Sequence, residues 1–168
     1  MEVQIIKVTT SSQVDVVASL AKTIWPDHYS PIIGRDQVDY MLAKYQTPKS
    51  ILAQMDQEGN SYFLIHSDSV PVGYIGIIEK HNELFLSKLY ILSMERGKGI
   101  GHAAIDFLKT KCRENGAPYI TLTVNKQNLN SICAYEKLGF ENYGEVVTDI
   151  GKGYVMDDYL MRLRISPR

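Results

Sequence analysis

The chain has 168 residues, of which 45% are hydrophobic and 22% charged, the composition of an ordinary globular protein with one sizeable core. A net charge of −1 leaves no electrostatic footprint for nucleic acid, and no apolar run approaches the roughly 18 residues of a membrane span. The N-terminus lacks the basic region of a secretion signal, so we expect a cytoplasmic protein that binds neither nucleic acid nor membrane.

The first part of the chain is predicted to contain one short strand followed by helices. Residues 3–8 form the strand, Ser11 or Ser12 caps the first helix, and Trp25-Pro26 ends it. A second helix begins near Asp36, and a third covers residues 48–57. The loop after the first helix carries His28 and Tyr29.

From Ser61 onward the pattern changes to strands. Residues 62–66 and 72–79 form a hairpin around Asp68-Ser69, and residues 84–92 form the next strand. All three segments are nearly continuous in apolar residues, which is typical of central strands that are covered on both faces.

The second half of the chain alternates helices and strands. We expect a helix over residues 99–114 that stops at Asn115-Gly116, a strand over 120–124, a helix over 128–138, and strands over 141–148 and 154–165. The segment from Leu84 to Val124 is therefore a βαβ crossover. Residues 1–168 are predicted to form a single α/β domain, with a mixed, mostly antiparallel central sheet flanked by helices.

A glycine-rich loop joins the central strand to the following helix. It reads Arg96-Gly97-Lys98-Gly99-Ile100-Gly101, and the first helical turn, which includes His102, carries no acidic residue. Free N–H groups and the positive end of a helix dipole coincide there, so the loop is typical of an anion site.

Three classes of phosphate loop compete for this segment. A Walker A loop would need a Lys followed by Ser or Thr at its end, and Gly99 follows Lys98 instead. A dinucleotide fingerprint is matched in form by Gly99-x-Gly101-x-x-Ala104, but it requires an acidic residue about 20 positions later, and residues 119–125 offer none. The third class is the coenzyme A pyrophosphate loop.

Two motifs in order resemble the GNAT superfamily of N-acetyltransferases. Arg96-x-x-Gly99-x-Gly101 is similar to the family's Gln/Arg-x-x-Gly-x-Gly/Ala signature, in the same position between strand and helix. Asn128-x-x-Ser131-x-x-x-Tyr135-x-x-x-Gly139-Phe140 resembles its second motif at the expected spacing. The resemblance covers roughly residues 60–165 and implies the GNAT fold and acetyl-CoA as co-substrate.

The resemblance also implies which residues contact acetyl-CoA. The loop amides would hold the pyrophosphate, and the strand backbone at Leu89–Ile91 would pair with the pantetheine arm. The implied coenzyme-binding residues are Leu89, Tyr90, Ile91, Arg96, Gly97, Lys98, Gly99, Ile100, Gly101, His102, Asn128, Ser131 and Tyr135.

For the chemistry, the resemblance implies Tyr135 as the general acid that protonates the departing thiolate. Many relatives carry a glutamate three positions before the Tyr90 position, but Ser87 stands there, so the general base cannot be transferred. Glu79, His81 and Glu83 are the alternatives, and of these Glu79 and Glu83 are the carboxylates we select.

The acceptor is predicted to be a small-molecule primary amine. His28 and Tyr29 lie where the family builds its acceptor pocket, and residues 149–161 are similar to PaiA-like polyamine acetyltransferases. Asp149, Asp157 and Asp158 could offset the charge of spermidine, and Asp157 is taken as the substrate contact. A protein or peptide amino group, or a regulator that binds coenzyme A without turnover, stays open as an alternative.

The sequence gives little indication of a metal site, a disulfide or a particular oligomeric state. Cys112 and Cys133 lack metal-ligand spacing and are expected to be reduced thiols, and the four histidines form no cluster, so we expect no metal. Because dimers are the commonest assemblies, a homodimer is the expected oligomer.

Overall fold

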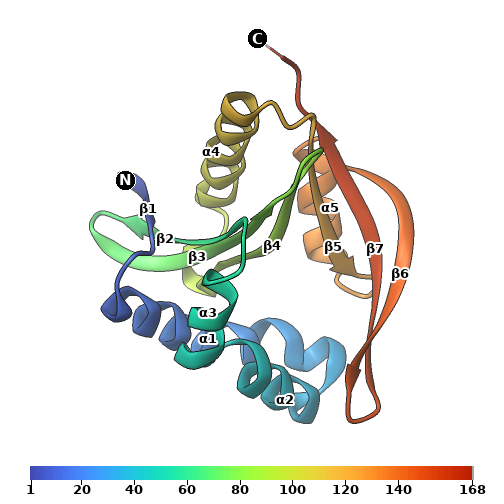
Figure 1. Cartoon of the computed structure of the whole chain (residues 1–168). Coiled ribbons are helices and arrows are strands. Elements are labelled where there is room, and N and C mark those ends of the chain that lie inside the picture. The colour runs from blue at the N-terminus through green and yellow to red at the C-terminus, as the bar shows by residue number, and fades with distance from the viewer. Residues whose placement is uncertain (168) are drawn as a thin grey trace.

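A single seven-stranded sheet runs through the protein (Figure 1). The computed structural model describes residues 1–167. The strands follow the order β1-β2-β3-β4-β5-β7-β6, and the only parallel pair among those described is β4 with β5. Their bounds are β1 Val3–Lys7, β2 Asn60–Ser67, β3 Val70–Glu79, β4 Leu84–Ile91, β5 Tyr119–Asn125, β6 Glu141–Gly151 and β7 Tyr154–Arg164. The predicted mixed, mostly antiparallel sheet and the crossover are confirmed.

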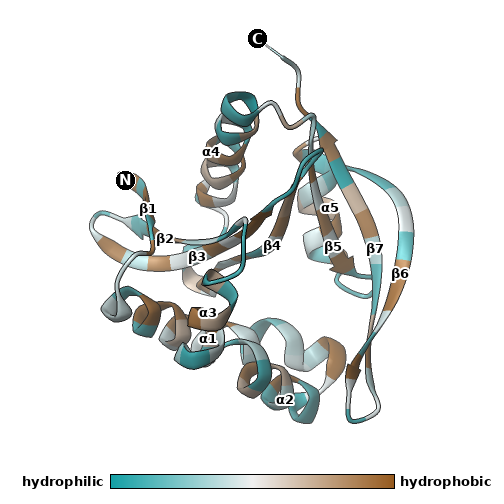
Figure 2. Ribbon diagram, viewed as in Figure 1, coloured by the Kyte–Doolittle hydropathy of each residue, from teal (hydrophilic) through white to brown (hydrophobic). Residues whose placement is uncertain are grey.

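Helices cover both faces of the sheet. Figure 1 shows α1, α2 and α3 on one side and α4 on the other, with α5 beside β5 and β7. The helices span α1 Ser11–Ile33, α2 Arg35–Tyr45, α3 Pro48–Met55, α4 Ile100–Asn115 and α5 Leu129–Lys137, and a short 3-10 turn covers Ser93–Glu95. In Figure 2 apolar residues run along β3 and through α1, whereas polar and apolar segments alternate along the β6–β7 hairpin.

The first helix differs from the prediction at both ends. Its N-cap is Thr10, whose hydroxyl accepts from the Gln13 amide (3.2 Å) while the Gln13 side chain accepts from the Thr10 amide (3.0 Å). The helix also continues through Pro26 and Pro31 to Ile33. A proline removes one helical hydrogen bond, but burial of Ile24 and Trp25 against the sheet holds the turn that contains Pro26. His28 and Tyr29 therefore lie on a helix and not in a loop.

Two apolar cores flank the sheet. One packs α4 against β3, β4 and β5 through residues such as Ile75, Leu86 and Leu108, and the other packs α1–α3 against the opposite face through residues such as Val17 and Tyr74. Because β3 contributes to both cores, its central residues are buried on both faces. This confirms the prediction made from its continuous apolar run.

Strands β4 and β5 separate after a short contact. They pair only at Leu84–Ile120 and Phe85–Thr121, although β4 continues to Ile91 and β5 to Asn125. A bulge in β4 at Ser87, opposite Gly76 and Ile77 of β3, begins where this pairing stops. The diverging strands leave two unpaired edges, and this opening positions the candidate site.

Candidate functional site

The glycine loop leaves open space at its surface. Gly97 and Gly99 have φ of +77° and +85°, a region that favours glycine, and a Cβ added at either position would meet no heavy atom within 4 Å. Helix α4 begins after Gly99 with no side-chain cap and no acid in its first turn. In the described chain, the first amide to donate along this helix is that of Ala103, to the Gly99 carbonyl (3.1 Å). The preceding amides are therefore available to an external anion.

A cavity of about 660 Å³, the loop-side cavity, opens in front of this loop. Most residues implied to contact acetyl-CoA line it: Leu89, Tyr90, Ile91, Arg96, Gly97, Gly99, Ile100, Gly101, Asn128, Ser131 and Tyr135. Two of the implied residues point elsewhere. Lys98 pairs with Glu95 (3.0 Å), and His102, largely exposed, pairs with Asp106 (3.2 Å).

The N–H donors, the open space and the charge around the loop-side cavity suit the diphosphate of coenzyme A. A diphosphate needs several N–H donors and space close to the backbone, and the α4 N-terminus provides both, with no carboxylate in its first turn. Asp27 and Glu95 also line the cavity, and Glu95 is paired with Lys98 (3.0 Å). The exposed Arg96 adds a cation at the rim, where its Nε also donates to the Ile91 carbonyl (3.2 Å).

A hydrogen bond between α1 and α5 joins the two sides of the site. The Asn128 side chain caps α5 by accepting from the Ser131 amide (3.3 Å), so its Nδ2 faces His28 Nε2 at 3.0 Å. Since Nδ2 can only donate, His28 accepts on Nε2 and carries its proton on Nδ1. Burial, and then the charge of Arg96, lower the pKa of His28 to about 4, which keeps the ring neutral at pH 7.

Tyr135 stands at the junction between this cavity and a second one. It lines both, and its ring packs edge-on against Phe140 with 5.3 Å between ring centroids. Burial, and then the neighbouring Tyr29, raise the pKa of its phenol. The hydroxyl is therefore protonated at neutral pH and can serve as a proton donor.

The second cavity, the helix-side cavity of about 420 Å³, lies between α1, α2 and the diverging strands. Aromatic residues form much of its wall: Tyr29 and Tyr90 share a 2.7 Å hydrogen bond between hydroxyls, and Trp25 packs against both rings. Trp25 Nε1 in turn donates to the Tyr74 hydroxyl (2.8 Å). Burial raises the pKa of Tyr29 to about 12, so this wall is amphipathic and its phenol is uncharged at neutral pH.

The two adjacent carboxylates of β7, Asp157 and Asp158, point to opposite faces of the strand because of its pleat. Asp157 faces outward and pairs with Lys126 at 3.0 Å, so the structure does not bring it to either cavity. Asp158, the next residue, faces inward, lines the helix-side cavity and is only 7% exposed. Its Oδ1 has no hydrogen-bond partner in the described chain. Burial, and then the charge of Asp157, raise the pKa of Asp158 to about 6, against a weaker opposing effect of the Thr123 hydroxyl.

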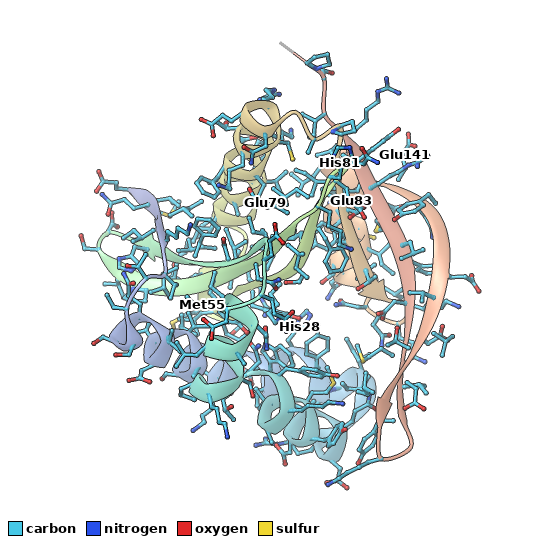
Figure 3. All side chains as sticks on the ribbon, in the orientation of Figure 1. His28, Met55, Glu79, His81, Glu83 and Glu141 are labelled. Atoms are coloured by element: carbon cyan, nitrogen blue, oxygen red, sulfur yellow. The ribbon has the colours of Figure 1, made fainter. Side chains whose placement is uncertain are left out.

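The two glutamates selected as general base lie at the other end of the sheet. Figure 3 shows Glu79 and Glu83 near the far end of β3 and β4, well separated from His28. Glu79 accepts from Asn115 Nδ2 (2.9 Å) at the end of α4, and Glu83 lies 3.8 Å from Lys80. Neither lines the loop-side cavity or the helix-side cavity. The turn between β3 and β4 lies away from Tyr135, so the structure does not bring Glu79 and Glu83 to either cavity.

Lys88 is a further candidate site residue that is not among those predicted from the sequence. It follows the β4 bulge, so its side chain points to the α1–α3 face and lines the helix-side cavity. Its Nζ donates to Gln54 Oε1 (3.3 Å) and lies 5.5 Å from the centre of the Tyr62 ring. Burial lowers the pKa of Lys88 to about 8. A lysine inside an apolar strand was the available signal, but only the bulge decides which face it takes.

The part of the chain that the structure describes, residues 1–167, offers neither a metal site nor a membrane-spanning helix. No group of three or more His, Cys, Asp or Glu side chains is placed to hold a metal ion there. Within the same part of the chain, no helix is long and apolar enough to cross a membrane.

The chain resembles known acetyltransferases in sequence. It matches the acetyltransferase (GNAT) domain family over residues 30–156. It is 27% identical over 118 residues to the peptidyl-lysine N-acetyltransferase YjaB of Escherichia coli, an alignment that covers 69% of this chain and 74% of that protein. It is 25% identical over 124 residues to the uncharacterized N-acetyltransferase YobR of Bacillus subtilis, covering 73% of this chain and 47% of that protein.

Solved structures share the fold. The PaiA N-acetyltransferase of Thermoplasma acidophilum, in complex with coenzyme A, superposes with a TM-score of 0.83 at 19% identity, covering 98% of this chain and 99% of that one. The ribosomal-protein-S18-alanine N-acetyltransferase of Escherichia coli superposes with a TM-score of 0.73 at 17% identity, covering 99% of this chain and 96% of that one.

Proposed function

Because the chain belongs to the GNAT acetyltransferase family, with the family match spanning residues 30–156, we propose that it acetylates a primary amine of a small molecule. It is an acetyl-CoA-dependent N-acyltransferase. One observation carries the proposal: the loop-side and helix-side cavities meet at Tyr135, in the opening between β4 and β5. A donor and an acceptor can thus approach each other from opposite faces of one sheet.

The loop-side cavity would hold acetyl-CoA. The amides of residues 97–101 suit its diphosphate, Arg96 supplies charge at the rim, and the unpaired edge of β4 at residues 89–91 suits an extended arm. When bound, acetyl-CoA supplies the activated acyl group. Asn128 and Ser131 border the same space and close it toward α5.

The remaining residues handle protons and position the acceptor. Tyr135 can donate a proton to the departing thiolate because its phenol stays protonated. Asp158 replaces Glu79 and Glu83 as the candidate carboxylate that accepts a proton from the incoming amine, since it lines the acceptor side and its pKa is raised toward neutrality. His28 and Tyr29 shape the entrance, whereas Asp157 is left outside.

Spermidine and peptidyl lysine are the two acceptors to compare first. The similarity of residues 149–161 to PaiA-like acetyltransferases favours spermidine, although of the three aspartates there only Asp158 lines the cavity. The 27% identity to a peptidyl-lysine N-acetyltransferase favours a lysine side chain in a peptide. Both supply a primary amine on a flexible apolar stem, which suits the aromatic wall.

The proposed function is tested by release of free coenzyme A. Purified protein is mixed with acetyl-CoA and either spermidine or a lysine-containing peptide, and the new thiol is measured over time. We expect acceptor-dependent thiol release and an acetylated product by mass spectrometry. Binding of acetyl-CoA by calorimetry without release for any amine would favour the non-catalytic regulator that Ser87 leaves open. Absence of binding would overturn both.

A further inference from the structure

The helix-side cavity contains two side chains of opposite charge that do not pair with each other. Lys88 comes from β4 and Asp158 from β7, and both line the same space. In the described chain, neither takes part in an ion pair. Partly or fully buried charges without counter-charges are costly, so a cavity that keeps one of each sign is suited to a ligand that brings both signs.

The cation lies toward the β2–β3 side of the cavity. The Lys88 stem crosses Gly76 of β3, where an added Cβ would lie 3.3 Å from Lys88 Cβ and 3.4 Å from its Cδ. From there Nζ reaches Gln54 Oε1 on α3 and the ring of Tyr62 on β2. These partners hold the ammonium in place but are neutral, so its charge remains uncompensated.

The carboxylate lies on the opposite side, two strands further along the sheet. Asp158 pairs in register with Asn125, at the end of the unpaired edge of β5. It is 7% exposed, and its Oδ1 has no partner in the described chain. Tyr135 lines this cavity as well, on the side where it meets the loop-side cavity. An amine at Asp158 would therefore stand near the point where acyl transfer takes place.

We propose that the acceptor is an amine that also carries an anionic group, a carboxylate or a phosphate, with the amine received at Asp158 and the anion at Lys88. This inference rests on the proposed acetyltransferase function and narrows its substrate class. It disfavours spermidine, because a polyamine would place a second cation beside Lys88 and would offer nothing to neutralise it.

The test compares acceptors that differ only in the anion. Glycine, β-alanine, 4-aminobutyrate, 5-aminopentanoate and 6-aminohexanoate are each set against the alkylamine of equal carbon number, and O-phosphoethanolamine against ethanolamine. We expect kcat/KM for the best anionic acceptor to exceed that of its partner amine by about 10-fold or more, in line with one charged hydrogen bond. The carboxylate and phosphate arms identify which anion is preferred.

Two variants test which residue receives the anion and which receives the amine. Lys88→Met keeps the apolar stem, and we expect it to reduce the preference for the anionic acceptor over its partner alkylamine to within about 2-fold. Asp158→Asn should lower kcat/KM for every amine by about 10-fold or more. The matched controls are Asp157→Asn, the adjacent outward carboxylate, and Lys80→Met, at the far end of the sheet.

The result that overturns this inference is a wild-type enzyme that acetylates spermidine and alkylamines at least as well as every anionic acceptor. An unchanged acceptor preference in a folded Lys88→Met variant does the same. If no amine is acetylated, the proposed function fails, and binding of 4-aminobutyrate against butylamine to protein with coenzyme A decides the inference separately. Equal or absent binding of both probes then counts against it.

Discussion

The two cavities are built in different ways. The loop-side cavity depends on backbone: glycines at positive φ, free amides at a helix start and an unpaired strand edge. The helix-side cavity depends on side chains from α1, β4, β5 and β7, which are distant in sequence. A backbone site appears as a short motif, whereas a side-chain site exists only after the chain has folded.

The largest effect is expected from a substitution that blocks the loop-side cavity and leaves the helix-side cavity intact. Gly99→Val places a branched side chain in the open space before α4, and we expect acetyl-CoA affinity to fall by at least about 100-fold in calorimetry. The free energy of unfolding should also fall, by about 1–2 kcal/mol, because φ is +85° there.

The other end of α4 offers a matched control. Gly116 is the C-cap, has φ of +73° and likewise has open space around an added Cβ. Gly116→Val should carry a similar backbone strain yet leave acetyl-CoA affinity within about 3-fold. Equal loss of affinity in both variants would show that strain, and not the phosphate site, explains the result.

A second variant acts where the two cavities meet. Tyr135→Phe removes only the hydroxyl, so we expect kcat to fall by about 10-fold to 10⁴-fold while acetyl-CoA affinity stays within about 3-fold. Single-turnover kinetics and calorimetry separate the two quantities. Tyr143→Phe, on exposed β6, is the control and should match the wild type. Unchanged turnover in Tyr135→Phe would remove the phenol from the chemistry.

The smallest effect concerns the His28–Asn128 bond that connects the two cavities. The pKa of His28 is lowered to about 4 in the folded protein, so between pH 6.5 and 4 the unfolded chain binds more protons at this residue. Its contribution to the free energy of unfolding is present near pH 7 and is lost as the pH falls. After allowance for solvent screening, we expect the protonation of His28 to lower the free energy of unfolding by about 1–2 kcal/mol between pH 7 and 4.

His28→Gln tests this contribution by urea unfolding at several pH values. The variant should lose less stability than the wild type between pH 7 and 4.5. His102→Gln, at an exposed histidine on α4, should follow the wild type. Asp158 has the opposite sign, because its pKa is raised to about 6: its folded form binds more protons between about pH 6 and 4. Asp158→Asn should therefore steepen the acid loss, and parallel curves for all variants would contradict the assigned pKa shifts.

Helix α1 and strand β7 show which features could not be predicted from the sequence. The spacing of apolar residues predicts the strands and most of the helices. The sequence also predicts a helix end at Pro26, because proline disfavours the interior of a helix, but the tertiary packing of Trp25 overrides this local preference. Likewise, Asp157 is predicted as the substrate contact among the three aspartates in residues 149–161, although nothing in the sequence shows which of them faces the site. The pleat of β7 turned Asp158 inward and Asp157 outward, a choice of one residue that pairing with β5 and β6 decides.

The sequence by itself determined the fold class, the crossover and the loop-side site, because glycine conformation, helix starts and strand periodicity depend on near neighbours in the chain. Only the tertiary structure decided that β4 and β5 diverge, that Lys88 and Asp158 face one cavity, and that Glu79 and Glu83 lie far from it. These outcomes depend on strand register, one bulge and the direction of a hairpin, and those are set by pairings between distant segments.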